Sequence, residues 1–373
     1  MILIVKGGKT MVKQRNTINY LNPYIPGKPI SEVKREFGLD KVIKLASNEN
    51  PLGSSPKATE AVAKWAANMA IYPDGNCTEL RNALAKKLNL KPEQFLFGAG
   101  TDQILELIAQ TFVNPEDNTI SAHPSFSRYE TVTRIMDGEF ITVPLDKDYR
   151  FDLDGILSHV GKKTRIVWIC NPNNPTGTII TSKELDCFLE KIPRDVLVVL
   201  DEAYYEYARG GGYPESLNLL DKYDNIIILR TFSKIYGLAG LRIGYAISNE
   251  DTIGYINRVR GPFNVNAAAQ LAAVAALEDQ DFLMKSLENN NKGKQYLYKA
   301  FDEMGLDYIP TYTNFIMVNV KTDSKQLFVD LLKKGVIIRS GDIFGMDNWI
   351  RVTIGTLEEN EIFIQALKEV LNN

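Results

Sequence analysis

One lysine stands in a setting that could support covalent chemistry. Lys234 lies among hydroxyls and glycines in residues 231–245 (TFSKIYGLAGLRIGY), and Arg242 follows it within the same segment. A lysine held in this way can form an imine with an aldehyde, while hydroxyls and an arginine can hold a phosphate. Residues 225–229 (NIIIL) predict a buried strand, so we expect Lys234 on the loop past a strand end, where open α/β sheets bind ligands. A surface lysine in a turn is the alternative for this motif alone.

Two further polar loops follow predicted buried strands. Residues 171–177 (NPNNPTG) come after the apolar run 165–170, and their asparagines offer neutral donors to a ligand oxygen. Residues 201–205 (DEAYY) come after the apolar run 196–200. The carboxylate of Asp201 could hold a protonated ring nitrogen, and Tyr204 could reach a ring hydroxyl. Taken singly, the first segment could be a plain loop and the second a solvated strand edge.

A glycine-rich turn, residues 98–102 (GAGTD), opens a predicted helix. Exposed backbone N–H groups at a helix start form a ready anion site. The turn lacks the G-x-G-x-x-G spacing of a dinucleotide-binding fold. A simple helix cap by Thr101 or Asp102 is the alternative.

These four loops together provide an amine nucleophile, phosphate donors, a carboxylate and an amide at four strand ends. Pyridoxal phosphate requires this set: its aldehyde takes a lysine, its phosphate takes amides, hydroxyls and an arginine, and its ring nitrogen takes an acid. The sequence therefore predicts a pyridoxal phosphate site.

Alternating strand and helix patterns from about residue 80 to 250 predict a mainly parallel α/β sheet covered by helices. Seven strands are expected, at residues 94–98, 118–122, 139–143, 165–170, 196–200, 225–229 and 243–247. After Pro262 the pattern becomes α+β, and residues 336–339 form one of its segments. We predict a large domain of residues 51–262 and a smaller one of residues 11–50 and 263–373, with residues 1–10 a possible extension before Met11.

Composition excludes several classes of protein. The chain has 373 residues with a net charge of −3, which attracts neither nucleic acid nor an anionic membrane. No apolar run reaches the ~18 residues of a membrane span. Three cysteines without a C-x-x-C pair and only two histidines argue against structural zinc or a disulfide framework. We expect a cytoplasmic protein without a metal.

The order and spacing of the motifs resemble those of fold-type I aminotransferases, and within them the histidinol-phosphate aminotransferase family. The resemblance runs from about residue 24 to the C-terminus. It is carried by residues 47–51 (SNENP), 72–74 (YPD), 98–102, 171–177, 201–204, 231–245, 262–266 (PFNVN), 314–315 (NF) and 350–355 (IRVTIG).

The resemblance implies a role for each matching residue around the cofactor. Lys234 would bind its aldehyde, Asp201 its ring nitrogen, and Asn174 with Tyr204 its phenolic oxygen. The phosphate would be held by Thr231, Ser233, Arg242 and the backbone of Gly100, Thr101 and Asp102. Tyr72 would reach the phosphate of the other subunit's cofactor, which implies a homodimer with shared sites.

The resemblance also implies a substrate site. Arg351 matches the arginine that clamps a substrate carboxylate, and Asn174 would lie beside the substrate. Histidinol phosphate has no carboxylate, so with that substrate Arg351 would have to take the phosphate. Arg339 matches the family's second arginine for the substrate phosphate, with Tyr24 helping from the partner chain; a surface charge is the alternative for Arg339.

One residue departs from the family pattern. The aromatic that stacks on the cofactor ring is commonly tyrosine, whereas residues 124–126 (PSF) offer Phe126. Stacking is retained but any hydroxyl role is lost, and a core aromatic is the alternative.

The implied reaction interconverts histidinol phosphate and 2-oxoglutarate with imidazole acetol phosphate and L-glutamate, a step of histidine biosynthesis. Two enzymatic alternatives share the scaffold: an aromatic aminotransferase acting on phenylalanine or tyrosine, and a pyridoxal phosphate-dependent decarboxylase of a phosphorylated amino acid. A non-catalytic regulator would need a basic DNA-binding module, which the sequence lacks.

Overall fold

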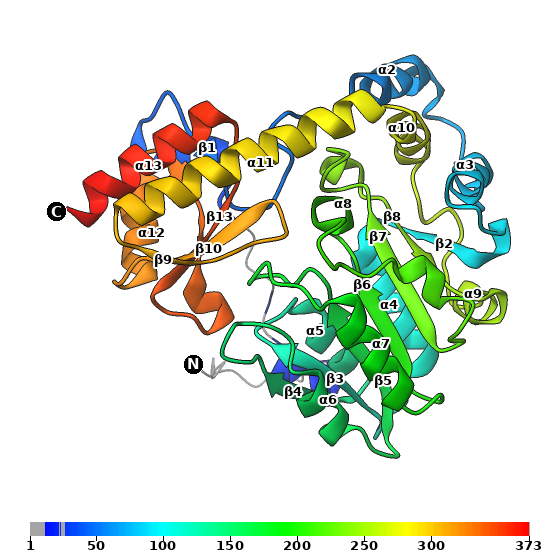
Figure 1. The fold of residues 1–373 in the computed structure, drawn as a ribbon. Coiled ribbons are helices and arrows are strands. Elements are labelled where there is room, and N and C mark those ends of the chain that lie inside the picture. The colour runs from blue at the N-terminus through cyan, green and yellow to red at the C-terminus, as the bar shows by residue number, and fades with distance from the viewer. Residues whose placement is uncertain (1–11, 22, 24–26, 373) are drawn as a thin grey trace.

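A seven-stranded sheet lies at the centre of the larger hydrophobic core (Figure 1). All strands run parallel except β8, which is antiparallel to both neighbours. In spatial order they are β2 (Phe95–Gly98), β8 (Gly244–Ile247), β7 (Ile226–Thr231), β6 (Leu197–Asp201), β5 (Thr164–Cys170), β3 (Asn118–His123) and β4 (Glu139–Pro144). The predicted fold class is confirmed, as is the position of each strand to within two residues.

The structure, a computed structural model, describes residues 12–21, 23 and 27–372. Residues 1–10, expected as an extension, and Tyr24 lie outside the described residues. Within the described part, no helix combines the length and the apolar character needed to cross a membrane.

Apolar residues explain why the central strands form. Strands β6 and β7 are buried along their whole length, as expected where helices cover both faces of a parallel sheet. The helices of this part are α2 (Pro56–Trp65), α3 (Thr78–Leu88), α4 (Gly100–Phe112), α5 (Arg128–Ile135), α6 (Leu153–His159), α7 (Ser182–Lys191), α8 (Tyr205–Ala208), α9 (Glu250–Asn257) and α10 (Ala267–Leu277).

A second core surrounds a four-stranded antiparallel sheet in the C-terminal part. The long helix α11 (Gln280–Glu303) runs from the large core to this smaller one (Figure 1). Its strands, in spatial order, are β12 (Arg339–Ser340), β13 (Trp349–Thr353), β10 (Phe315–Asn319) and β9 (Asp307–Ile309), and its other helices are α12 (Ser324–Lys333) and α13 (Leu357–Leu371). This is the predicted α+β part.

Residues 30–44 of the N-terminal segment pack on the C-terminal part. Strand β1 (Ile43–Lys44) pairs in parallel with β11 (Val336–Ile337), and α1 (Ile30–Phe37) packs beside α12. The segment 336–339 belongs to two short strands, because the chain changes sheets at Ile338 and the next residues pair with β13. Helix α10 packs within the large core, and the exact domain limits remain a prediction.

Candidate active site

The candidate site lies at one edge of the large sheet. Strands β2, β3, β5, β6 and β7 are parallel, so their carboxyl ends share this edge, and the reversed strand β8 begins there. The segments that leave these strand ends are residues 98–102, 124–126, 171–177, 201–205 and 231–242. The topology therefore brings together all four loops selected from the sequence.

Lys234 follows the end of β7 and is half-buried. Its Nζ donates a hydrogen bond to the backbone oxygen of Ser47 at 3.3 Å and lies 5.6 Å from the centre of the Tyr204 ring. Burial, and next the positive charge of Arg351, lower the pKa of Lys234 to about 8. The neutral, nucleophilic amine is therefore accessible near neutral pH.

Asp201 ends β6 and is 3% exposed. Its Oδ2 accepts a hydrogen bond from the hydroxyl of Tyr129 at 2.8 Å, whereas Oδ1 has no donor of good geometry within the described residues. Burial raises the pKa of Asp201 to about 6, and the hydrogen bond from Tyr129 opposes that rise. At neutral pH Oδ1 is thus a buried anionic acceptor that calls for a charged donor.

Tyr204 is joined to the N-terminal segment and to β13 by a buried chain of hydrogen bonds. Its hydroxyl accepts from Nδ2 of Asn48 at 3.0 Å. The Asn48 backbone N–H donates to Oγ1 of Thr353 at 3.0 Å, and that hydroxyl donates to Oδ1 of Asn48 at 3.1 Å. Tyr204 is 3% exposed, so these contacts hold its ring in one orientation.

Arg351 and Asn174 link the two halves of the molecule. Arg351, on β13, donates through Nη1 to Oδ1 of Asn174 and through Nη2 to the backbone oxygen of Ala46 at 2.9 Å. Its guanidinium also lies 5.2 Å from the centre of the Phe315 ring. Arg351 is 6% exposed, so the guanidinium has a fixed place beside the sheet edge.

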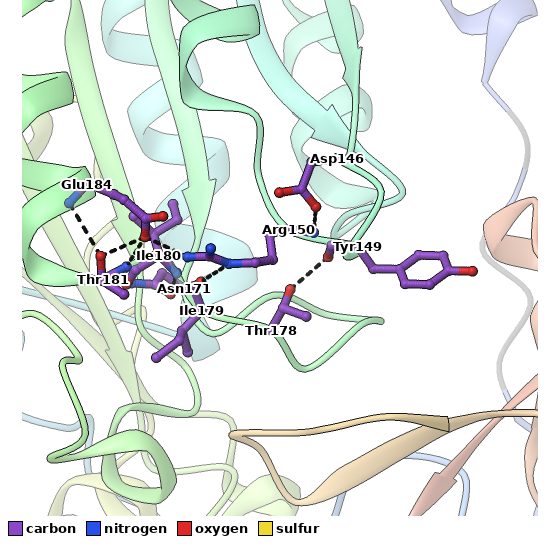
Figure 2. A network of polar contacts seen from close by, with 9 residues as sticks. All are labelled: Asp146, Tyr149, Arg150, Asn171, Thr178, Ile179, Ile180, Thr181 and Glu184. Carbon is purple, nitrogen blue, oxygen red and sulfur yellow. Dashed lines mark hydrogen bonds and ion pairs between the residues drawn. The ribbon is translucent and has the colours of Figure 1, made fainter. Parts of the chain in front are cut away.

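The loop after β5 is held by a network of polar contacts beneath it (Figure 2). The side chain of Asn171 accepts from the Ile180 backbone N–H at 2.9 Å and donates to the Ile180 oxygen at 3.1 Å. Thr178 donates to the backbone oxygen of Tyr149 at 2.8 Å, while the Tyr149 ring points away from the network and meets Trp349 of β13 edge-on. These contacts hold in place the loop that contains Asn174.

The proposed phosphate contacts form a compact group. Thr231 Oγ1 accepts from the Ser233 backbone N–H at 3.0 Å, and Nη1 of Arg242 donates to Ser233 Oγ at 3.4 Å. Nη2 of Arg242 pairs with Asp102 at 3.1 Å, in the first turn of α4. Gly100 has φ +75°, a backbone conformation that favours glycine, and the Arg242 guanidinium packs directly against it, where a Cβ would displace it.

The two aromatic residues predicted for the site have different surroundings. Phe126 lies at the same sheet edge and packs edge-on against Tyr129, with ring centres 5.7 Å apart. Tyr72 is 79% exposed, and its ring stacks on Phe263 with centres 4.8 Å apart. An exposed aromatic pair of this kind is typical of a contact with another molecule.

Helix α4 begins at Gly100, so Thr101 and Asp102 stand in its first turn, and neither side chain caps it. The structure therefore does not show the simple helix cap that was the alternative for this turn.

Two residues predicted for the substrate site remain. Arg339 lies on β12, directly opposite Arg351 on β13. Tyr24 lies outside the described residues.

The residues at this edge fit pyridoxal phosphate on two observations. The buried Oδ1 of Asp201, to which no side chain of the described residues donates, suits the protonated ring nitrogen, and the half-exposed guanidinium of Arg242, packed against Gly100 at the start of α4, suits a phosphate. Within the described residues, no group of three or more histidine, cysteine, aspartate or glutamate side chains is arranged to hold a metal ion.

Three residues at the site were not selected from the sequence. Ser47 and Asn48 stand in a segment that was noted only for its resemblance, and they contact Lys234 and Tyr204. Tyr129 contacts Asp201. The sequence around it gives no indication of a role in a site, because a single tyrosine on a helix is indistinguishable from an ordinary core residue.

Known proteins resemble this chain over nearly its whole length. Residues 40–367 match the family described as aminotransferase class I and II. The chain is 56% identical over 357 residues to a histidinol-phosphate aminotransferase of Caldicellulosiruptor saccharolyticus, covering 96% of this chain and 99% of the relative. It is 52% identical to the Moorella thermoacetica protein of the same name, covering 97% and 94%. A solved histidinol-phosphate aminotransferase of Sinorhizobium meliloti, in complex with pyridoxal-5'-phosphate, has a TM-score of 0.90 at 29% identity, covering 98% of this chain and 99% of its own. The chain belongs to the class I and II aminotransferases, and within them to the histidinol-phosphate aminotransferase family.

Proposed function

We propose that this protein is a pyridoxal phosphate-dependent aminotransferase that interconverts histidinol phosphate and 2-oxoglutarate with imidazole acetol phosphate and L-glutamate. The observation that carries the proposal is the placement of Lys234 and the buried Asp201 at the sheet edge where Arg351 enters from the smaller part. The reaction belongs to histidine biosynthesis, and we place it in the cytoplasm.

Each loop of the site has a proposed task in holding the cofactor. Asp201 accepts a hydrogen bond from the protonated ring nitrogen through Oδ1, while Asn174 and Tyr204 contact the phenolic oxygen. Phe126 covers one face of the ring. The phosphate is held by Thr231, Ser233, Arg242 and the backbone of Gly100, Thr101 and Asp102.

When bound, the cofactor supplies an aldehyde that takes up amino groups and a ring that accepts an electron pair. Lys234 would hold the aldehyde through Nζ and would give up that place to the substrate amine. The released Nζ then accepts the proton from the substrate's α-carbon, which its lowered pKa of about 8 permits near neutral pH. Asp201, ionised at that pH, keeps the ring nitrogen protonated.

The substrate phosphate is proposed to lie against Arg339 and Arg351. These two residues are direct partners on antiparallel strands, so both side chains leave the same face of the small sheet. Planar guanidinium groups match phosphate oxygens in pairs, which suits them for this task. Tyr24 of the second subunit is proposed to assist.

A homodimer is part of the proposal. Three apolar side chains, Met69, Ile71 and Tyr72, are 73–79% exposed on one short segment, and Phe263 stacks on the last of them. Apolar surface of this kind calls for a partner. A second copy covering this segment would bring Tyr72 to the neighbouring cofactor phosphate.

A half-reaction panel tests the function. The loaded enzyme is mixed with histidinol phosphate, phenylalanine, tyrosine or threonine phosphate, and the spectral change from the pyridoxal to the pyridoxamine form is followed without a keto acid. We expect histidinol phosphate to give the highest rate at low concentration. Faster conversion by phenylalanine would favour the aromatic aminotransferase, and release of carbon dioxide from threonine phosphate would favour the decarboxylase.

A further inference from the structure

We propose that Tyr129 is a positioning residue that holds Asp201 with one carboxylate oxygen engaged and the other kept for the cofactor's ring nitrogen. The inference rests on the proposed pyridoxal phosphate site and concerns a residue that is not expected to touch the cofactor itself. Tyr129 makes four contacts that support this role, each between buried or half-buried groups.

The first contact assigns the two oxygens of the carboxylate different tasks. The Tyr129 hydroxyl donates to Oδ2 of Asp201 at 2.8 Å, and Oδ1 is left without a donor of good geometry in the described chain. Both residues are buried, with exposed fractions of 0% and 3%, so water does not compete for Oδ2. The Ala203 backbone N–H also lies close enough to the carboxylate to lower the pKa of Asp201. Tyr129 supplies the side-chain contact, and by holding Oδ2 it restricts the rotation that would turn Oδ1 away from the site.

The second and third contacts make the hydroxyl a fixed point. The Tyr129 ring stacks on Trp168 of β5, with ring centres 5.5 Å apart and planes 2° from parallel. Its backbone oxygen accepts from Thr133 Oγ1 at 2.8 Å, and that hydroxyl is hydrogen-bonded to Thr119 of β3 at 2.7 Å. Two contacts thus hold helix α5 on the sheet, one to β5 through the ring and one to β3 through Thr133. They restrict movement of the Tyr129 hydroxyl.

The fourth contact extends the same support to the expected ring-stacking residue. The Phe126 ring meets Tyr129 edge-on, with centres 5.7 Å apart and planes at 84°. Tyr129 therefore touches both Asp201, proposed to bind the ring nitrogen, and Phe126, proposed to cover the ring face. One buried side chain sets the position of both.

The charges around Tyr129 indicate how its hydroxyl affects the protonation of Asp201 and of the ring nitrogen. Burial raises the pKa of the Tyr129 phenol well above its ordinary value, so the group stays protonated and donates throughout the working pH range. The same hydrogen bond lowers the pKa of Asp201 against the larger effect of burial. A donor to the carboxylate favours the ion pair of pyridinium and carboxylate over the neutral pair, in which the proton has moved to Asp201.

A purely structural role predicts something different. A buried tyrosine that only satisfies its own hydroxyl would, on removal of that hydroxyl, alter stability and leave the ring nitrogen unchanged. The decisive measurement is therefore the protonation of that nitrogen in the loaded enzyme, independent of turnover.

The test uses Tyr129→Phe, which removes the hydroxyl and keeps the ring on Trp168. Wild type and variant are loaded with pyridoxal phosphate labelled with ¹⁵N in the ring, and the ¹⁵N chemical shift is recorded at one neutral pH. We expect the variant's signal to move toward the value of neutral pyridine. Dissociation of the cofactor should become about tenfold easier, since a hydrogen bond to a charged group is weakened. An unchanged ¹⁵N shift in a folded, loaded variant would overturn the proposal.

Two further proteins keep the result interpretable. Tyr298→Phe removes the hydroxyl of a half-buried tyrosine, which accepts from the Thr311 backbone N–H at 2.7 Å, and it should leave the ¹⁵N shift at the wild-type value. Site-specific 3-fluorotyrosine at position 129 makes a stronger donor without removing any group, and it should move the signal toward pyridinium, opposite to Tyr129→Phe. A shift in the same direction as Tyr129→Phe would contradict the proposal even if that variant fails to fold. Failure of the wild type to bind the labelled cofactor would instead contradict the proposed function.

Discussion

Arg339 and Arg351 face each other as direct partners on the antiparallel strands β12 and β13. Like charges in this arrangement are destabilising, by roughly the 0.2–1 kcal/mol typical of cross-strand pairs. Arg351 is also 6% exposed, which increases the cost of holding two positive groups together. An anion bound on this face would offset that repulsion, and a phosphate carries enough charge to serve both arginines.

Replacing Arg339 by alanine should separate the candidate substrates. Loss of a charge-assisted contact is expected to lower kcat/KM for histidinol phosphate about 10- to 100-fold, while the value for phenylalanine changes little. Steady-state kinetics with both substrates measure this. Arg258→Ala serves as a control, because Arg258 stacks on Tyr255 in another part of the molecule. Equal losses for both substrates, or none, would remove the phosphate role.

Affinity for the cofactor should depend on pH through Asp201. Its pKa, raised by burial to about 6 in the free enzyme, should be lower once a pyridinium lies beside Oδ1. Binding therefore prefers the ionised form: affinity is fully present above pH 6 and is lost as the pH falls below it. Titration of the apoenzyme with pyridoxal phosphate between pH 5 and 8 measures this dependence. Asp201→Asn should bind pyridoxal phosphate more weakly, and its affinity should not fall further below pH 6. The same fall in that variant would show that another group causes the pH dependence.

The rate at which the apoenzyme captures the cofactor should rise with pH (the basic limb), because it depends on deprotonation of Lys234. The neutral amine is the reactive form, so the capture rate should rise with pH and level off above about 8. Arg351→Gln removes a positive charge that lowers this pKa, and the limb should therefore move to higher pH. Arg351→Lys keeps the charge and should leave the limb near its wild-type position. Stopped-flow absorbance after mixing apoenzyme and cofactor gives the rates, and coincident limbs in all three proteins would exclude this coupling.

Two inactive variants should restore activity together if sites are shared. In a dimer of Lys234→Ala with Tyr72→Ala, one site has an intact Lys234 and receives an intact Tyr72 from the other chain. Co-expression of the two, with different tags, should give about a quarter of the wild-type activity, because half of the dimers are mixed and each has one working site. Tyr72 acting within its own chain predicts no recovery. Light scattering on the wild type checks the dimer independently.

Removing one partner of the buried ion pair between Glu202 and Arg230 should destabilise the protein more than replacing both partners by apolar residues. Arg230 donates through Nε to Oε2 of Glu202 at 2.9 Å, and its Nη2 forms an ion pair with the same oxygen at 2.8 Å. The side chains of Arg230 and Glu202 are 3% and 1% exposed. Glu202→Gln removes one charge and leaves the other buried, which typically costs about 3–5 kcal/mol. The double variant Glu202→Leu with Arg230→Met should unfold closer to wild type. Urea midpoints at one protein concentration measure this, and a double variant no more stable than the single would contradict it.

Local patterns in the sequence determined most of the fold and the centre of the site. Long apolar runs placed the strands, and the polar residues directly after them pointed to Lys234, Asp201 and Asn174. These signals are strong because a buried strand and the loop that follows it are contiguous in the chain, so their residue types are visible side by side.

The tertiary structure decided which distant residues complete the site. Ser47 reaches Lys234 across 187 positions of sequence, and Tyr129 reaches Asp201 from a helix that looks ordinary by itself. The pairing of Arg339 with Arg351 exists only because the chain leaves one sheet at Ile338 and joins another. Such contacts depend on strand order and packing between segments, which local residue preferences do not encode, and for that reason the sequence alone indicated the cofactor's lysine and acid but not the groups that position them.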